Sequence, residues 1–359
     1  MSPCPDGFTL YNPRASSSAA ASISTVIIRG RGVLFEQILR RGDVTRDVRE
    51  AVDPPQSSNP LRFGAARSGE DGLRMKILVL GASGMLGHTV LRRLHRSGGR
   101  EVFGAARDLR VRARFPADLA ERILPAGDFG QADAVAAAVA EVLPDVIVNC
   151  VGVIKQLASA KDPLHTIPLN SLLPHRLAVL ARLRGARLVH ISTDCVFSGR
   201  KGGYTEADTP DADDLYGLSK RLGEVGGPGA ITLRTSIIGR ELGSKTGLVE
   251  WFLSQTGEAR GFTRAIFSGV TASELARVID EVVLPRPDLE GLYQVAAEPI
   301  AKHDLLVLLK AHYGVSTLIR PDDELVIDRS LKADRFKAAT GYAPPSWPEM
   351  IAQMDTPLD

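Results

Sequence analysis

The sequence lacks the marks of a membrane protein or a nucleic-acid-binding protein. No apolar run approaches the roughly 18 residues that a membrane-spanning helix needs. The charges nearly balance, with 44 basic and 42 acidic side chains and a formal net charge of +2. No dense basic run and no stripe of basic and aromatic residues offers a surface for nucleic acid. We therefore expect neither a membrane nor a nucleic acid as a partner.

Cysteine is also scarce, since the chain has only Cys4, Cys150 and Cys195. No CxxC motif and no Cys/His ligand spacing is present, so we expect no metal site. We interpret the three thiols as reduced, in a cytoplasmic protein. Cys150 lies in an apolar strand pattern and is interpreted as a small core residue.

Residues 1 to 74 lack the apolar periodicity of a folded segment. They contain six prolines and ten arginines but no lysine. Such a segment cannot easily bury a core, which predicts a disordered extension. The alternative is that synthesis starts at Met75, where the folded pattern begins, which would leave 359 − 74 = 285 residues.

From Met75 onward, strand-like and helix-like segments alternate. This alternation predicts an α/β fold with a Rossmann-like doubly wound parallel sheet and helices on both faces. Nearly continuous apolar strands fit central positions that are buried on both sides. The expected strands are 76–80, 101–105, 145–149, 187–191 and 230–234, and the expected helices are 85–96, 133–142, 172–183 and 215–224.

After Ile238 the alternation becomes irregular, which predicts a smaller C-terminal substrate-binding region. We expect a dinucleotide-binding domain at 75–238, with a return segment near 264–285. The substrate-binding region would then comprise 239–263 and 286–359.

Three glycines stand between the first strand and the first helix, in KILVLGASGMLGHTVLRRL. In a dinucleotide site the turn must bend sharply, the backbone must approach a pyrophosphate, and the helix must pack closely on the strand. A side chain would obstruct all three, and the helix N-terminus attracts phosphate. The segment therefore predicts a dinucleotide site, with a plain tight turn as the alternative; its spacing is GxxGxxG rather than GxGxxG. The expected cofactor contacts here are Gly81, Ser83, Gly84, Met85, Leu86 and Gly87.

The residue that reads the adenosine ribose should follow the second strand, where an acid favours NAD. The first polar residue there is Arg107, whose guanidinium could pair with a 2′-phosphate. We therefore expect NADP(H) as the preferred cofactor. Because of Asp108, NAD(H) remains an alternative cofactor. The alternative interpretation of Arg107 is a solvated charge in a loop.

Tyr216 and Lys220 lie four residues apart in LYGLSKRLGE, which puts them on one face of a helix. A cation beside a phenol favours the phenolate and should lower the pKa of Tyr216. Such a tyrosine can exchange a proton with a substrate oxygen near neutral pH. The glycine turn upstream strengthens the interpretation of this pair as catalytic.

Ser192 and Thr193 follow a strand in VHISTDCVFSG. They should lie at the carboxyl end of the sheet, where ligands bind in open α/β folds. A hydroxyl group there could donate a hydrogen bond to a carbonyl oxygen. A turn or a helix cap is the alternative for both residues.

These three motifs together resemble those of the extended short-chain dehydrogenases. Within that group the chain is most similar to the family of dTDP-4-dehydrorhamnose reductase-like nucleotide-sugar reductases. The resemblance extends from about Met75 to Met354. Further matching segments are GDF at 127–129, PDVIVN at 144–149, RTSIIG at 234–239 and GLY at 291–293.

The resemblance implies a role for each matching position. Thr193 would orient a sugar C4 carbonyl, with Ser192 beside it, and Tyr216 would protonate the resulting alkoxide. Lys220 would hold the nicotinamide ribose and tune Tyr216. The remaining implied cofactor contacts are Asp128 and Phe129 at the adenine, and Cys150, Val151 and Gly152 in the small-residue run beside the cofactor.

The chain departs from this family at Cys195, where an aromatic residue is common, and in the loop VGVIKQ at 151–156. That loop should border the sugar, so the particular sugar is left open. We expect Lys155 to line the sugar site, with a solvated loop charge as the alternative. Asn170 could position backbone near the site. Trp251 could stack on the nucleotide base or pack within the smaller region.

Together these features predict an NAD(P)H-dependent oxidoreductase that reduces the C4 ketone of a nucleotide-linked 4-keto-6-deoxy sugar. One alternative is an epimerase or dehydratase on the same fold. Another is a non-catalytic regulatory subunit resembling the β-subunit of methionine adenosyltransferase. The sequence is silent on the oligomeric state and leaves a homodimer open.

Overall fold

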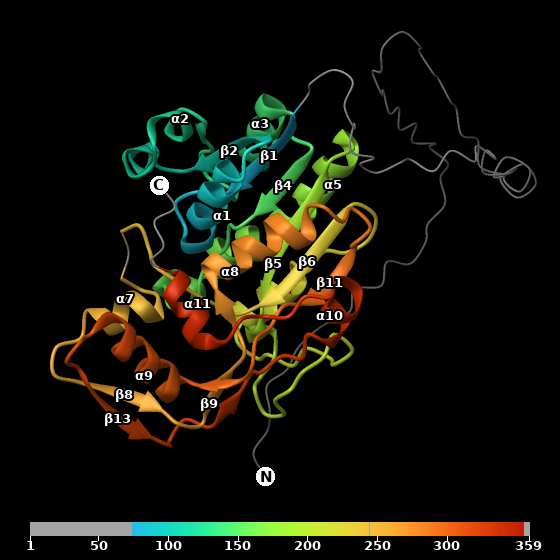
Figure 1. Ribbon diagram of the computed structural model, residues 1–359. Coiled ribbons are helices and arrows are strands. Elements are labelled where there is room, and N and C mark those ends of the chain that lie inside the picture. Colours follow the sequence, from blue (N-terminus) through green and yellow to red (C-terminus); the bar gives the residue numbers. More distant parts are fainter. Residues whose placement is uncertain (1–73, 244, 355–359) are drawn as a thin grey trace, which may run out of the picture. The chain divides into compact units, whose positions relative to one another are not determined.

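A seven-stranded parallel sheet forms the centre of the fold, in the strand order β11-β6-β5-β4-β1-β2-β3. The computed structural model describes residues 74–243 and 245–354 (Figure 1). The sheet confirms the expected Rossmann-like fold class. Its strands are β1 (Met75–Leu80), β2 (Arg100–Ala106), β3 (Ile123–Pro125), β4 (Val146–Asn149), β5 (Arg187–Thr193), β6 (Ala230–Thr235) and β11 (Gly291–Gln294).

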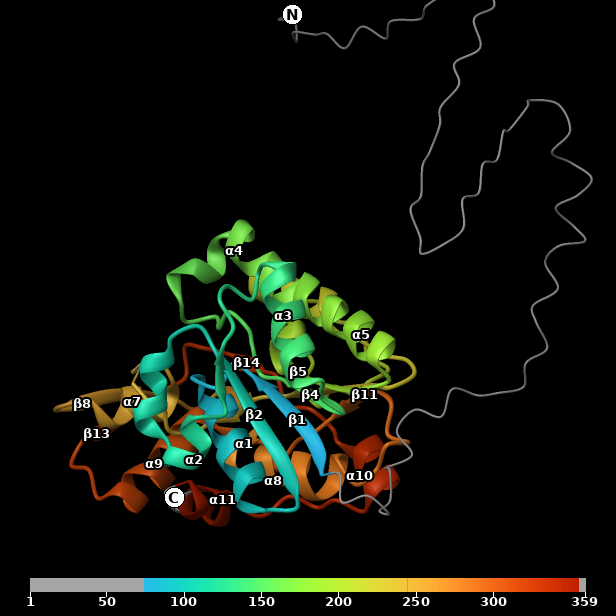
Figure 2. The same cartoon turned by 90° about the horizontal axis from the view of Figure 1, so that it is seen from above.

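Helices cover both faces of this sheet, because each has one apolar stripe to bury. Figure 2 shows α3, α4 and α5 on one side of the strands and α1 and α8 on the other. The bounds are α1 (Met85–Arg96), α3 (Ala132–Val142), α4 (Pro163–Ile167), α5 (Leu173–Arg184) and α8 (Ala272–Arg277).

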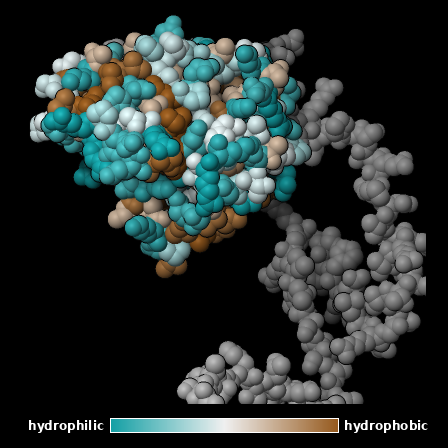
Figure 3. All heavy atoms as spheres, turned by 90° about the horizontal axis from the view of Figure 1, so that it is seen from below, coloured by the Kyte–Doolittle hydropathy of each residue, from teal (hydrophilic) through white to brown (hydrophobic). Residues whose placement is uncertain are grey.

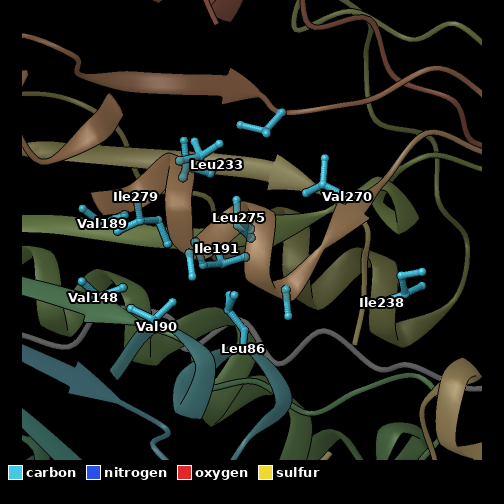
Figure 4. Packing of buried hydrophobic residues seen from close by; sticks show 14 of the residues in the cluster. Leu86, Val90, Val148, Val189, Ile191, Leu233, Ile238, Val270, Leu275 and Ile279 are labelled. Carbon is cyan, nitrogen blue, oxygen red and sulfur yellow. The ribbon is translucent and has the colours of Figure 1, made fainter. Parts of the chain in front are cut away.

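Helix α1 shows how the sequence sets this packing. Leu86, Val90 and Leu94 recur at intervals of four residues and are all buried. They contribute to the largest of three apolar clusters among the described residues, in which α1 and α8 meet the sheet (Figure 4). The second core lies on the opposite face, where Val135 of α3 and Leu177 of α5 are fully buried.

Smaller sheets complete the C-terminal part of the described chain. They have the orders β12-β9-β14, β13-β8 and β10-β7. Their strands are β7 (Ile237–Ile238), β8 (Glu258–Phe262), β9 (Ala265–Phe267), β10 (Val270–Thr271), β12 (Ile300–Ala301), β13 (Leu318–Asp322) and β14 (Ile327–Asp328). The remaining helical segments are η1 (Leu109–Arg114), α2 (Ala117–Ala120), η2 (Ala158–Lys161), η3 (Pro168–Leu172), η4 (Asp194–Val196), α6 (Leu215–Leu222), α7 (Leu248–Leu253), η5 (Val278–Val283), α9 (Lys302–Tyr313), α10 (Asp334–Thr340) and α11 (Trp347–Gln353).

The expected boundary of the smaller region needs a correction. We assigned 286–359 to that region, but β11 (Gly291–Gln294) pairs with β6 and belongs to the main sheet. The three-residue edge strand β3 was not expected at all, because so short a run has no visible periodicity. The expectation for residues 1 to 74 lies outside the described residues, except at Arg74.

The described helices include none that is long and apolar enough to cross a membrane. The molecular face in Figure 3 mixes hydrophilic residues with smaller apolar patches. Apolar atoms form a large part of the surface of folded proteins in general.

Candidate active site

The glycine turn joins β1 to α1 at the carboxyl edge of the sheet. Gly81 has a φ of +81°, in the left-handed region that favours glycine. Its amide and that of Ala82 donate to Ala105 O at 3.1 and 3.0 Å, which fixes the turn against β2. The Gly84 amide donates to Gly81 O at 2.9 Å. The chain therefore reverses sharply here, as the sequence predicts.

The other two glycines differ in their surroundings. A Cβ on Gly87 would stand 2.0 Å from Gly81 O, so α1 can approach the turn only because this side chain is absent. A Cβ on Gly84 would have its nearest neighbour, Gly81 O, at 3.4 Å, and Gly84 is exposed. Gly87 thus serves close packing, whereas Gly84 leaves the surface of the turn open.

The start of α1 fits a phosphate group. Gly84 provides no side-chain cap, and the first turn holds no acidic residue. The first amides of the helix are therefore available to an anion, which the helix dipole also favours. Ser83 beside them is exposed, whereas Leu86 packs in the core and Met85 lies against Gly239 and Gly247.

Arg107 and Asp108 follow β2 and differ in their contacts. Asp108 accepts hydrogen bonds from Arg110 N at 2.9 Å and Arg110 Nε at 2.7 Å. These bonds lower the pKa of Asp108. Arg107 is exposed and forms no hydrogen bond or ion pair with the residues that the structure describes.

The predicted adenine contacts follow β3. Asp128 is exposed, and its Oδ1 accepts from Gly130 N at 2.9 Å. Phe129 is only 3% exposed and belongs to the second apolar core. The ring thus packs in the core, whereas Asp128 and Gly127 beside it are exposed.

The segment after β4 connects the glycine turn to the tyrosine-lysine pair. A Cβ on Gly81 would lie 3.2 Å from the carbonyl carbon of Cys150. A Cβ on Gly152 would lie 3.9 Å from Lys220 Nζ. Small residues at 150–152 therefore sit between the two predicted sites. Burial raises the pKa of the Cys150 thiol to about 12, so this thiol is inert.

Thr193, Asp194 and Tyr216 form the centre of the candidate site. Thr193 Oγ1 accepts from Cys195 N at 3.1 Å and donates to Asp194 Oδ1 at 3.1 Å. The Thr193 hydroxyl group is close enough to Tyr216 to lower the pKa of its phenol. The structure therefore brings the predicted threonine and tyrosine close together, although they come from β5 and α6.

The protonation state of Tyr216 differs from the expectation. Burial raises its pKa above the usual value; the neighbouring Cys195 adds to the rise, and the hydrogen bond with Thr193 partly offsets it. We expected Lys220 to lower this pKa. Instead, Lys220 Nζ donates to Ile191 O at 2.7 Å, and burial lowers the lysine pKa to about 8.

Ser192 does not share the surroundings of Thr193, because successive residues of a strand point to opposite faces. Its Oγ donates to Glu224 Oε1 at 2.7 Å, and Ser192 is 4% exposed. Glu224 also accepts from Arg234 Nε at 2.9 Å and from its Nη2 at 2.8 Å. This geometry favours a structural role for Ser192 over a contact with substrate.

Two contacts hold the loop at 151–156 against the rest of the site. Asn170 Oδ1 accepts from Val153 N at 2.8 Å, and its Nδ2 donates to Ser219 Oγ on α6 at 3.2 Å. Asn170 thus positions backbone, as expected. Lys155 Nζ pairs with Asp214 Oδ2 at 2.5 Å, just before Tyr216 in sequence. Trp251 lies on α7 and is 36% exposed.

Sequence comparison assigns the family. The model of the RmlD substrate binding domain matches residues 75–261, which is more than half of the chain. The chain belongs to this family. Within the described residues, no group of three or more His, Cys, Asp or Glu side chains could hold a metal ion.

Two curated relatives of this RmlD-family chain have different names. The dTDP-4-dehydrorhamnose reductase of Burkholderia thailandensis is 33% identical over 152 residues, which cover 42% of this chain and 45% of that protein. The methionine adenosyltransferase 2 subunit beta of Danio rerio is 34% identical over 172 residues, covering 45% and 48%. The chain therefore spans about half the length of these relatives.

Solved structures share the fold over a larger range. A dTDP-4-dehydrorhamnose reductase from Bacillus anthracis in complex with NADP has a TM-score of 0.65 at 20% identity, covering 79% of this chain and 99% of that one. A UDP-glucose 4-epimerase from Thermus thermophilus in complex with NAD has a TM-score of 0.63 at 19% identity, with the same coverage. At such identities the likeness establishes the fold.

The sequence did not reveal every member of the site in this RmlD-family protein. Asp194 is 5% exposed and accepts a hydrogen bond from Thr193 Oγ1, but a lone aspartate after a strand gives no sign of function in the sequence. Arg329 reaches the same region from the C-terminal part, where its Nε donates to Phe197 O at 2.9 Å. Because Arg329 is far from Tyr216 in the sequence, its position near the site could not be predicted.

Proposed function

We propose that this protein is an NAD(P)H-dependent reductase of the C4 ketone of a nucleotide-linked 4-keto-6-deoxy sugar. The observation that carries the proposal is the proximity of Thr193 to Tyr216, with Lys220 buried beside Gly152 in the segment that separates this pair from the glycine turn. The dTDP-4-dehydrorhamnose reductase name of one relative supports this substrate class.

The side chains divide the work as follows. A bound nicotinamide dinucleotide supplies the hydride. Tyr216 would donate a hydrogen bond to the carbonyl oxygen, with the Thr193 hydroxyl group beside it. The Tyr216 phenol would then give its proton to the alkoxide oxygen. Because burial raises the tyrosine pKa, Tyr216 stays protonated near neutral pH, which suits a proton donor in the direction of reduction.

Lys220 and Asn170 would position the other components. Lys220 lies between Gly152 and Ile191 O, where its ammonium group could also reach the ribose of the nicotinamide. Asn170 ties the loop at Val153 to Ser219 on α6 and so fixes the helix that carries Tyr216. Neither residue needs to exchange a proton with substrate.

The geometry after β2 supports NADP(H) over NAD(H). Asp108 already binds Arg110 through two hydrogen bonds, which occupies the carboxylate that would read a ribose hydroxyl. Arg107 is exposed and unpaired among the described residues, so its guanidinium is available for a 2′-phosphate.

The test is a panel of dTDP- and UDP-linked 4-keto-6-deoxy sugars, each offered with NADPH and with NADH, with absorbance at 340 nm as the readout. The wild type should oxidise NADPH in the presence of one sugar, and NADPH faster than NADH. Tyr216→Phe should bind NADPH normally yet lose at least about a hundredfold in kcat, because general acid catalysis contributes on this scale.

Three results would contradict the proposal. Full activity in Tyr216→Phe would remove the assigned proton donor. Conversion of sugar without net NADPH loss would indicate an epimerase or dehydratase. Copurification with a methionine adenosyltransferase, without turnover of any sugar, would favour a regulatory subunit.

A further inference from the structure

Glu224 is a buried carboxylate that two strands of the main sheet hold in place. Ser192 Oγ on β5 donates to its Oε1 at 2.7 Å. Arg234 on β6 donates to both oxygens, through Nε at 2.9 Å and Nη2 at 2.8 Å. The side chains of Arg234 and Glu224 are 2% and 13% exposed. Because the guanidinium fork binds both oxygens, the carboxylate has a fixed position and orientation.

Lys220 lies one helical turn before Glu224. Helix α6 ends at Leu222, and Gly223 continues in the right-handed conformation, with φ and ψ of −89° and −1°. Side chains four residues apart therefore share one face of this segment. A Cβ on Gly223 would stand 1.9 Å from Asn170 O, so the lack of a side chain lets this end of the helix pack closely on η3.

Lys220 and Glu224 also reach neighbouring points of the same strand. Lys220 Nζ donates to Ile191 O at 2.7 Å, and the next residue of β5 is Ser192, which donates to Glu224. Lys220 forms no ion pair with the described residues, so Glu224 acts on its ammonium group through space. An ammonium group has three donors, and Ile191 O accepts from one of them. Glu224 can therefore attract the ammonium group without occupying the donors that are left.

The other titratable groups near Lys220 in the described part of the chain are neutral near pH 7. Burial lowers the pKa of His190 on β5 well below its usual value. Burial raises the pKa of the Cys150 thiol to about 12, and it also raises the pKa of Tyr216 above its usual value. Glu224 is thus the group that presents a negative charge to Lys220 at neutral pH.

We propose that Glu224 is a positioning residue that keeps the Lys220 ammonium group charged and directed at Ile191 O. Arg234 and Ser192 fix the carboxylate, and its negative charge offsets part of the cost of burying the ammonium group. The two remaining donors of Lys220 are then available to a ligand. Their contact with the nicotinamide ribose rests on the proposed function, but the coupling of Glu224 to Lys220 does not.

A double-mutant cycle tests this coupling without cofactor or substrate. It compares the free energies of unfolding in urea of wild type, Glu224→Gln, Lys220→Met and the double variant, at pH 6 and at pH 10. At pH 6, Glu224→Gln should cost more stability in the wild-type background than in the Lys220→Met background, because only the former loses the attraction. At pH 10 the two costs should be equal, since Lys220, with a pKa of about 8, has released its proton.

A second cycle covers the case in which Glu224→Gln does not fold, because that variant leaves the Arg234 cation buried without its anion. Glu224→Leu and Arg234→Met are then made together, with and without Lys220→Met. This change removes both members of the buried pair and leaves no unpaired charge. The coupling to Lys220 should have the same sign at pH 6 and should again disappear at pH 10.

The pH dependence of NADPH affinity, measured by fluorescence titration, shows whether the coupling positions Lys220 for the cofactor. Wild type should lose affinity as the pH rises above about 8, where Lys220 releases its proton. In Glu224→Gln this loss should begin about one pH unit lower, because a nearby opposite charge shifts a pKa on this scale.

Asp280→Asn is the matched control for both measurements. Asp280 is also a buried carboxylate, and it accepts from Ser97 Oγ at 2.5 Å and from Arg93 Nε at 3.1 Å. It is not among the groups that act on Lys220. Asp280→Asn should therefore lower the stability but leave the pH dependence of NADPH affinity as in wild type.

A coupling of the same size at pH 6 and pH 10 would overturn the proposal, because Glu224 would then act by packing alone. An NADPH curve that Lys220→Met changes but Glu224→Gln leaves at its wild-type position would also overturn it. If Lys220→Met itself binds NADPH as wild type does, the role of Lys220 in the proposed function is refuted. A coupling that disappears at pH 10 would still support the link between Glu224 and Lys220 in that case.

Discussion

Lys220 carries its ammonium group into a buried position, with only 6% of the residue exposed. Burial lowers its pKa from 10.5 to about 8, although Glu224 and Cys150 act in the opposite direction. Between pH 8 and pH 10.5 the unfolded chain therefore holds a proton that the folded chain has released. The charged form opposes folding below pH 8, and this cost disappears as the pH rises through the window.

We expect a Lys220→Met variant to reveal this cost. Between pH 7 and pH 10, the free energy of unfolding of wild type should rise by about 2 to 3 kcal/mol because Lys220 releases its proton, whereas the variant should not gain this stability. The difference, variant minus wild type, should therefore fall by that amount. Urea unfolding of both proteins at a series of pH values measures the difference. A difference that stays constant with pH would show that Lys220 titrates normally.

At the residue scale, the spacing of residues in the sequence predicted which side chains share a helix face. It did not predict how buried those side chains are or which partners they contact. The i, i+4 rule placed Tyr216 and Lys220 on one helical face. It could not show that burial would raise the tyrosine pKa, since burial depends on every segment that packs over α6. Likewise, the pair Ser192 and Thr193 was visible in sequence, but the partner of Ser192 on Glu224 was not.

Two glycines of the turn between β1 and α1 are needed for different reasons. Ala at position 87 would place its Cβ 2.0 Å from a backbone oxygen that cannot move freely. Ala at position 84 would meet that oxygen at 3.4 Å, with φ and ψ of −78° and 162° that any residue adopts.

We therefore expect opposite outcomes for the two alanine variants. Gly87→Ala should lower the free energy of unfolding of the cofactor-free protein by about 1 to 3 kcal/mol, as overpacking does. Gly84→Ala should leave that stability nearly unchanged but weaken NADPH binding, because its methyl group occupies the surface offered to the pyrophosphate. Urea unfolding and fluorescence titration separate the two effects. Equal stability losses in both variants would contradict this division.

Elements with strong periodicity were predicted well, as the agreement between 85–96 and α1 (Met85–Arg96) shows. Each buries one apolar stripe in the core, and that stripe is legible in sequence. The strands β12, β13 and β14 were not predicted. They have two to five residues, and they form because a distant partner strand is available rather than from a pattern of their own.

At the scale of the whole described fold, a buried hydrogen bond ties the C-terminal part to α8. Tyr342 Oη donates to Glu274 Oε1 at 2.7 Å, and Glu274 is fully buried. Arg277 also binds Glu274, through Nε at 2.9 Å and Nη2 at 2.6 Å. The chain after β14 is thereby connected to a helix that packs on the main sheet.

We expect Tyr342→Phe to lower the free energy of unfolding by about 1 to 2 kcal/mol, since a hydrogen bond to a buried charged group is lost. Tyr293→Phe is the matched control, because the Tyr293 hydroxyl has no hydrogen bond within the described residues while its ring is also buried. Chemical denaturation of both variants gives the comparison. Equal changes in the two would show that the bond to Glu274 contributes nothing.

The order of the strand and helix segments alone predicts helices on both faces of the parallel sheet, because alternating strands and helices permit few other arrangements. The pairing of β11 with β6 could not be predicted. Gly291–Gln294 follows a long irregular stretch, and its partner β6 offers an open edge that sequence does not display.

The pairing of β9 with both β12 and β14 also sets an order of events during synthesis. The turn at Gly81 requires only β1, β2 and the start of α1, all of which leave the ribosome early. The three-stranded sheet β12-β9-β14 cannot form until β14 has emerged and joined β9. A nascent chain folds from its N-terminal end. The glycine turn can thus form while the C-terminal strands are still being translated.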